Sequence, residues 1–230
     1  MAFTAADVMR RASTILQDGD AVHWTATELR DWLNEGMRAI VTVKPNATSA
    51  TATLSLVSGT KQTLPATYTM LHKAVRNTGG KAIRTLARRE ILDAQIPDWH
   101  SNTGLSFHVV VDMVLQDPMS LREFYVVPGN TGTGSIEAIV GFVPAPIPLP
   151  SAGVLDVSSY TAAVPFDDIY QGILLDLVLF RAFSKDSAAP AAAQRAQAHL
   201  GLAQAALQGL GLAQGAMSLA AAYGVPAAAG

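Results

Sequence analysis

The 230-residue sequence contains no cysteine, which excludes disulfide bridges, thiolate nucleophiles and cysteine-based metal sites. Only 15% of the residues are charged and the net charge is −2, so the composition indicates neither a nucleic-acid nor a membrane partner. Half of the residues are hydrophobic. This combination fits either an ordinary alanine-rich globular protein or a subunit that hides much of its surface in an assembly. The polar N-terminal stretch lacks the apolar core of a secretory signal, which predicts a protein made and retained in the cytoplasm.

Recognisable catalytic and cofactor motifs are also missing from the sequence. Gly79-Gly80-Lys81 is not a phosphate loop, because Ala82 stands where a serine or threonine should follow the lysine, and we expect a tight turn there. No GxSxG elbow occurs. Ligand-type residues gather over one stretch: Asp93, Asp98, His100, His108 and Asp112. Their spacing does not place two of them on one helical face, which favours surface and loop residues over a metal site. We expect no catalytic residue, cofactor or metal.

Residues 1–45 are predicted to form a helical hairpin. Thr4 can cap a first helix that continues to about Leu16, with Val8, Ala12 and Ile15 on its apolar face. The second helix has a clearer start, because Thr25 and Glu28 stand at the spacing of a capping box and Trp24 and Leu29 at that of a hydrophobic staple. Apolar residues then recur at helical spacing until Pro45 ends the helix.

Residues 46–150 are predicted to form an inserted, small antiparallel β region. Polar and apolar residues alternate from Thr48 to Val57, and residues 61–64 are expected to pair back on this strand as a hairpin. The other predictions for this region are strands at 71–75, 81–86, 107–111, 124–127 and 136–142, and a short helix at 88–95. The glycine-rich segment 129–135 is expected to be a flexible projecting loop. The proline-rich segment 144–150 is expected to be a stiff, extended connector.

Residues 151–187 contain the central helix of the predicted bundle, Asp167–Phe183. This helix is apolar nearly all round, so it has to be covered on several sides. It is too short for a membrane span, which needs about 20 apolar residues. Ile169 and Ile173 belong to its main apolar stripe. On the opposite side we expect three residues to meet a neighbouring subunit: Leu175, Leu179 and Phe180.

Residues 188–230 consist almost entirely of alanine, glycine, leucine and glutamine, and only Arg195 and His199 could carry charge near neutral pH. Pro190 can begin a helix, which we expect to lead into an extended tail that contacts partners. Helices at both ends of the chain around an antiparallel β insertion predict an α+β fold. The N- and C-terminal helices are expected to form one bundle.

A basic cluster stands out in the β region: Lys73, Arg76, Lys81, Arg84, Arg88 and Arg89. No acidic residue lies between Lys73 and Arg89. Three interpretations stay open, namely a solvated strand face, a salt-bridged partner surface, and a face that meets phosphate backbones. Interleaved aromatic residues, which a stacking platform for nucleic-acid bases needs, are missing.

Short motifs follow one another through the middle of the chain: Leu64-Pro65, Leu71, Val75-Arg76-Asn77, Gly80, Ala82-Ile83-Arg84, Arg89, Leu92-Asp93, Pro97-Asp98-Trp99 and Phe124-Tyr125-Val126-Val127-Pro128. The helix at 28–41, the strand at 136–144 and the run from Ala182 to Asp186 extend the pattern. In this order they resemble the head-to-tail adaptor (connector) proteins of tailed bacteriophages, over about residues 20–200. The long, nearly uncharged 188–230 tail departs from the family pattern and puts the mode of portal attachment in doubt.

The resemblance implies a structural virion protein without enzymatic activity, made in the host cytoplasm and placed at the head-tail junction. It implies a homo-oligomeric ring, commonly dodecameric, beneath the portal protein, with a docking surface for tail or nozzle proteins and genomic DNA passing non-specifically through the lumen. The C-terminal segment often grips the portal. The candidate portal contacts are Arg195, His199, Leu202, Leu207, Leu212 and Met217.

Three alternatives stay open at this point. The chain could be a neck or tail-completion protein further from the portal, and deletion of residues 188–230 separates this role from that of the adaptor. It could be a DNA-binding module that uses the basic cluster, whose binding would weaken steeply with salt. It could be a hydrolase that uses Asp93, Asp98 or His100.

Overall fold

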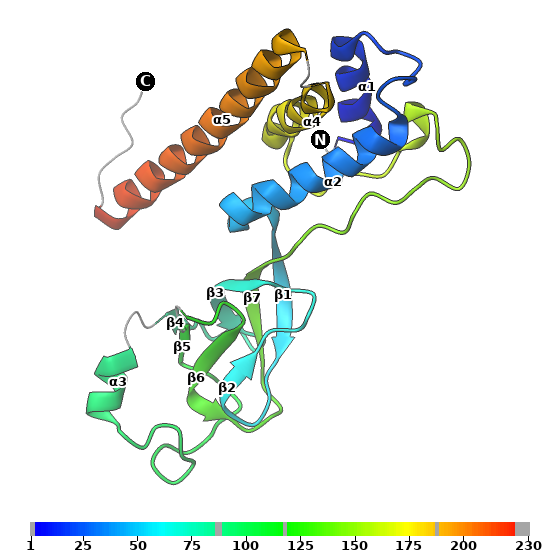
Figure 1. The fold of residues 1–230 in the computed structure, drawn as a ribbon. Helices are drawn as coiled ribbons and strands as arrows, with labels where there is room; N and C mark the ends of the chain where they lie inside the picture. Colours follow the sequence, from blue (N-terminus) through cyan, green and yellow to red (C-terminus); the bar gives the residue numbers. More distant parts are fainter. Residues whose placement is uncertain (1–2, 86–88, 117–118, 187–188, 224–230) are drawn as a thin grey trace. The chain divides into compact units, whose positions relative to one another are not determined.

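A computed structural model describes residues 3–85, 89–116, 119–186 and 189–223, with side chains of the last helix described up to residue 212. The chain divides into two compact units (Figure 1). The helical unit comprises Met1–Ala47 and Pro144–Gly230, and the β unit comprises Thr48–Val143. Helices precede and follow an antiparallel β insertion, so the predicted α+β fold is confirmed.

The two N-terminal helices of the helical unit begin where their caps predict. Helix α1 spans Ala5–Leu16, and the Thr4 hydroxyl accepts a hydrogen bond from the Asp7 N–H at 3.2 Å. Helix α2 spans Ala26–Val43 and begins with the expected capping box of Thr25 and Glu28. One detail of the prediction was wrong. Ile15 is 46% exposed and lies off the apolar face of α1.

The central helix α4 spans Gln171–Lys185 and follows a short 3₁₀ turn, η3, at Asp168–Tyr170. It therefore begins later than predicted, and Ile169, expected in the apolar stripe, is 59% exposed on that turn. Helices α1, α2 and α5 all pack against α4, and α5 spans Pro190–Tyr223. The helical unit thus supplies within one subunit the cover that an almost wholly apolar helix requires.

The proline-rich segment 144–150 is fixed to α2 and belongs to the helical unit. The Ile147 N–H donates to Asn34 Oδ1 at 2.7 Å, and Arg30 Nε donates to the Ile147 carbonyl at 2.7 Å. The Ile147 side chain is buried in the helical core. Beyond the 3₁₀ turn η2 (Val157–Ser159), the chain pairs with the N-terminus, where the Ala5 N–H donates to the Ala162 carbonyl. The segment has neither helix nor strand and belongs to the helical unit, whereas the prediction grouped it with the β region.

Seven strands and one short helix make up the described part of the β unit. The first sheet has the order β1-β7-β3, built from Ser49–Ser55, Ser135–Gly141 and Met70–Asn77. The second has the order β2-β6-β5-β4, built from Gly59–Thr63, Glu123–Asn130, Met113–Gln116 and Arg84–Thr85. The 3₁₀ turn η1 (Pro45–Thr48) precedes β1, and helix α3 (Arg89–Gln95) lies between β4 and β5. Residues of both sheets share one apolar core.

Strand pairing in the β unit departs from the prediction. β1 pairs with β7 and β2 pairs with β6, so β1 and β2 do not form the expected hairpin. The predicted strand at 81–86 shortens to Arg84–Thr85 among its described residues. The predicted strand at 107–111 is a loop. Both backbone groups of Val111 bond to the buried side chain of Asn77 and not to a neighbouring strand: the Val111 N–H donates to Asn77 Oδ1, and the Val111 carbonyl accepts from Asn77 Nδ2. The actual strand, β5, begins two residues later at Met113.

The glycine-rich segment 129–135 is an anchored turn and not the projecting loop that its composition predicted. Asn130 is fully buried, and its amide nitrogen donates to the carbonyls of His108 and Val109. Its side-chain oxygen accepts from the N–H groups of Gly132 and Gly134. A Cβ at Gly134 would lie 2.3 Å from the Asn130 amide nitrogen, so this close approach requires glycine.

Candidate interaction surfaces

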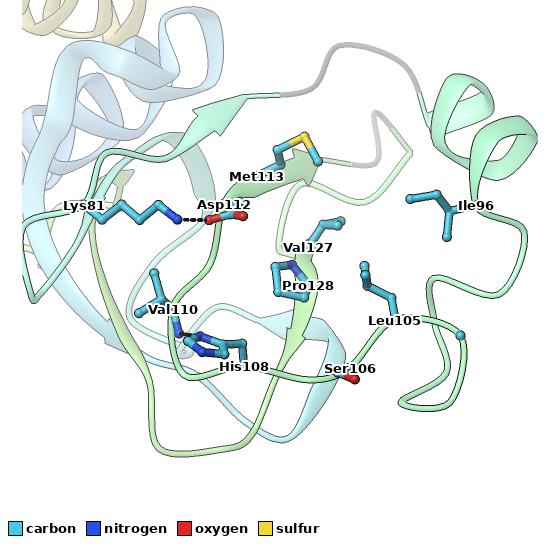
Figure 2. A pocket seen from close by; sticks show the side chains of 11 residues that line it. Lys81, Ile96, Leu105, Ser106, His108, Val110, Asp112, Met113, Val127 and Pro128 are labelled. Carbon is cyan, nitrogen blue, oxygen red and sulfur yellow. Dashed lines mark hydrogen bonds and ion pairs between the residues drawn. The ribbon is translucent and has the colours of Figure 1, made fainter.

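A pocket of about 760 Å³ opens on the β unit beside β5 and β6 (Figure 2). Met113, Val127 and Pro128 are among its apolar lining residues. At its rim, Lys81 Nζ lies 2.6 Å from Asp112 Oδ1, and His108 Nδ1 accepts from the Val110 N–H at 3.1 Å. The titratable groups of the rim are therefore engaged with each other or with the backbone. The arrangement favours apolar contact over acid–base chemistry.

The ligand-type residues of the 93–112 stretch have structural contacts. Asp93 Oδ1 accepts from the indole N–H of the fully buried Trp99 at 2.8 Å. His100 Nδ1 lies 2.7 Å from the Thr60 hydroxyl, and partial burial together with the Arg89 charge lowers the pKa of His100. Within the described ranges, no group of three or more histidine, aspartate or glutamate side chains could hold a metal ion. Asp93 thus links α3 to its following turn, and His100 links that turn to strand β2.

Ion pairs occupy much of the predicted basic face. Arg76 pairs with Glu137 at 2.8 Å, Lys81 pairs with Asp112, and Arg89 pairs with Asp93 at 3.3 Å. Lys73 and Arg84 are exposed and make no ion pair with any described residue, whereas Arg88 lies outside the described residues. Pairing of this kind lowers the positive potential of the surface, so a DNA-binding module based on this cluster gains little support.

Arg89 is the centre of an aromatic cluster that sequence analysis missed. Its guanidinium lies 5.3 Å from the centre of the Tyr125 ring and 6.0 Å from that of Trp99. The His100 ring packs on Trp99 with ring centres 3.6 Å apart. Such cation–π contacts stabilise by about 0.5–1 kcal/mol at exposed sites. The Pro97-Asp98-Trp99 motif was the available signal, although sequence alone does not show which cation meets the tryptophan.

The predicted inter-subunit face on α4 lies mostly inside the subunit. Leu179 is fully buried and Leu175 is 6% exposed, and both belong to the core that α1, α2 and α5 complete. Only Phe180 of the three is partly exposed. The expectation that Leu175 and Leu179 meet a neighbour is corrected, because α5 of the same chain packs along α4.

The predicted portal contacts divide into two groups. Arg195 stacks over the Phe183 ring at 5.7 Å, and His199 Nδ1 lies 2.8 Å from Asp176 Oδ1, so both contact α4. Leu207 is partly buried against the helical core. In contrast, Leu202 and Leu212 are 57% and 76% exposed. The side chain of Met217 lies outside the described residues.

A polar clamp, which sequence analysis also missed, joins the C-terminal end of α4 to the loop before α2. Lys185 Nζ donates to the His23 carbonyl at 2.6 Å and pairs with Glu28 at 2.9 Å. His23 in turn lies 3.0 Å from Asp186, and the indole N–H of Trp24 donates to the Ala182 carbonyl. The Ala182–Asp186 run therefore holds the helical hairpin against the central helix.

The surfaces of this chain are those of a structural subunit. Three members of the basic cluster are ion-paired, the pocket of the β unit is largely apolar, and the last helix leaves leucines in solvent, as in a subunit built for assembly. No helix in the described part of the chain combines the length and apolarity that crossing a membrane requires.

A protein-family model described as SU10 adaptor protein matches residues 3–228, so the chain belongs to this adaptor family. A search of curated proteins finds no match to the chain. Family membership gives the protein a structural role as a phage adaptor and makes it a component of the virion. Phage adaptors are a structural, non-enzymatic kind of protein. The predicted resemblance is confirmed.

Proposed function

We propose that this adaptor occupies the head-to-tail junction, where it forms a ring beneath the portal protein and offers a docking surface to tail or nozzle proteins. Twelve copies are the expected number from the resemblance to other adaptors. Genomic DNA would pass non-specifically through the lumen during ejection. Family membership supports the setting. The resemblance to other adaptors supports the ring, its copy number and the passage of DNA, and the exposed leucines of α5 support the portal contact.

The observation that carries the portal contact is the outer side of α5. Leu202 and Leu212 are the exposed large hydrophobic residues of its described part, at 57% and 76%. No aspartate, glutamate, lysine or arginine occurs after Arg195, so the remainder of this helix carries no formal charge that would oppose contact with a partner protein. Exposed leucines on a helix face without formal charge are candidates for a protein–protein contact. Small neighbours such as Gly201 and Gly209 have open space around them and would permit close approach of a partner helix.

The test is a mass measurement in solution with and without portal, on the wild-type chain and on Leu202→Asp/Leu212→Asp. We expect wild type to join the portal as a ring and the double variant to lose portal binding at least tenfold while staying folded. Leu155→Asp is the matched control, because Leu155 is 75% exposed on a different segment. A wild-type chain that ignores the portal would contradict the proposal.

The passage of DNA through the lumen requires only weak, sequence-independent attraction. The exposed Lys73 and Arg84 are the described members of the basic cluster that no acid neutralises. Binding of the assembled ring to a DNA fragment should therefore be weak and fall with salt. Tight DNA binding by the free chain would instead favour the DNA-binding alternative.

A further inference from the structure

The two sheets of the β unit have four outer strands, and three of them are protected against pairing with another chain. β2 carries Lys61, which pairs with Glu123, and a register shift lies between Gly59 and Lys61. The outer edge of β3 is covered at its C-terminal end by its own chain, where the Ile83 N–H donates to the Val75 carbonyl and the Asn77 N–H donates to the Lys81 carbonyl. The pairing of β3 with β7 is also irregular, with register shifts between Leu71 and Lys73 and between Ala74 and Arg76. β4 comprises Arg84 and Thr85 among the residues that the structure describes. Charge, irregular pairing, cover and shortness are the usual means of blocking a sheet edge.

The outer edge of β1 has none of these protections. Its seven residues, Ser49–Ser55, read SATATLS, without charge, proline or glycine, and its pairing with β7 runs through without a register shift. In the described sheet it pairs only with β7, which places it at one side of the three-stranded order β1-β7-β3 (Figure 1). A strand that is flat, uncharged and open on one side is a template for a further strand.

The register shows which backbone groups this edge presents. The Leu56 N–H donates to the Gly134 carbonyl, and the Phe142 N–H donates to the Thr48 carbonyl, at the two ends of the ladder. Bonded and non-bonded pairs alternate in an antiparallel ladder, so Ala50, Ala52 and Leu54 bond to β7. The residues between them direct their N–H and C=O groups away from β7: Ser49, Thr51, Thr53 and Ser55. Their side chains are exposed.

We propose that the open edge of β1 binds an extended segment of a tail protein, which adds a strand to the β1-β7-β3 sheet. Main-chain hydrogen bonds supply the affinity in such strand addition, and side-chain alternation supplies the selectivity. The segment that fits is about seven residues long, uncharged, rich in threonine, serine or valine, and free of proline where it faces β1. Cross-strand threonine pairs of this kind are favourable.

The choice of a different protein over a second copy of this chain rests on the proposed function. Pairing of β1 with β1 of another copy is two-fold symmetric and closes after two subunits, so it cannot build a ring. A neighbouring copy could pair with β1 through one of its own edge strands only if it had a second open edge. The protected edges of β2, β3 and β4 leave none among the described strands.

A proline at position 53 tests the proposal without disturbing the subunit. The Thr53 N–H makes no bond to β7, and proline is tolerated at edge-strand positions whose N–H faces solvent. Thr53→Pro should therefore fold and join the portal like wild type, and reduce attachment of purified tails to adaptor-filled heads at least tenfold. Thr53→Val, which keeps the N–H, should attach tails like wild type. If the proline variant does not fold, the double substitution Thr51→Lys/Thr53→Lys takes its place in the same measurement, because two lysines block the edge by charge.

Electron microscopy of the tail-filled junction gives the second readout. We expect a strand of a tail protein beside β1. Wild-type tail attachment by both blocking variants, an unpaired β1 in the junction, or a strand from a second copy would each overturn the inference while leaving the adaptor role intact. Failure of the wild-type chain to join the portal would instead remove the proposed function, and this inference with it.

Discussion

The helical unit and the β unit differ in where their stabilising interactions lie along the chain. In the helical unit, helix starts are set by residues three apart, as in the capping boxes of Thr4 with Asp7 and of Thr25 with Glu28. In the β unit, the decisive bonds join residues far apart, as between Asn77 and Val111. The helical unit is thus organised by local signals and one large apolar core. The β unit is organised by buried polar side chains that hold loops in place.

This comparison predicts that the helical unit is most sensitive to charge in its core. Leu179→Asp should destabilise it by more than about 4 kcal/mol, because Leu179 is fully buried and an unpaired carboxylate there loses its hydration. Urea unfolding followed by circular dichroism measures the change. Ile169→Asp is the control, since Ile169 is 59% exposed at the start of the same segment. Equal, small effects of the two substitutions would show that Leu179 lies on an open face.

The β unit should be most sensitive to loss of a buried amide. Asn130→Ala removes four hydrogen bonds, to His108, Val109, Gly132 and Gly134, and leaves the buried Gly134 N–H without this partner. We expect a loss of about 2–4 kcal/mol in the unfolding free energy. Hydrogen exchange of the 129–135 turn should increase at the same time. Thr131→Ala, on the exposed part of the same turn, should change neither quantity noticeably.

The same difference explains which parts of the fold can be predicted from sequence. The α2 capping box and the apolar character of α4 were readable because their partners lie within a few residues or within one helical period. The order β1-β7-β3 was not readable, because a strand's own alternation is satisfied by any partner strand. Asn130 illustrates the limit best. The glycine-rich segment around Asn130 has the composition of a flexible loop. It is a fixed turn because the Asn130 amide donates to the carbonyls of residues 108 and 109, which are distant in sequence.

Among the surfaces, sequence located the basic cluster but not the acids that pair with it. Glu137 and Asp112 reach Arg76 and Lys81 through strand pairing and the fold of a loop. Likewise, Leu175 and Leu179 were recognised as needing cover, yet the covering element turned out to be α5 of the same chain. A pattern of this kind shows that a face is buried and leaves open what buries it.

A smaller effect tests the local character of the helical unit. Thr25→Ala removes the hydroxyl that accepts the Glu28 N–H at 3.3 Å, and the loss of such a cap costs about 1 kcal/mol. Thermal unfolding should report this change. Thr42→Ala, near the end of the same helix, is the control, because its hydroxyl only bonds back to the Arg38 carbonyl. A cap effect no larger than that of the control would mean that tertiary packing alone sets the start of α2.

The smallest expected effect concerns acid sensitivity of the loop between α1 and α2. The Asp18 carboxylate accepts from the N–H groups of Trp24, Val22 and His23, and these bonds, that of Trp24 first, lower the pKa of Asp18 below its ordinary 3.8. A group with a depressed folded-state pKa stabilises the fold above its unfolded value, and the contribution is lost as the pH falls through the folded value. Asp18→Asn should therefore be less stable than wild type at pH 7, and the difference should shrink below pH 3.8. Asp20→Asn is the control substitution, because the Asp20 carboxylate accepts none of these three bonds. If the Asp18 difference persisted unchanged into acid, the loop would be held by the shape of the side chain and not by its charge.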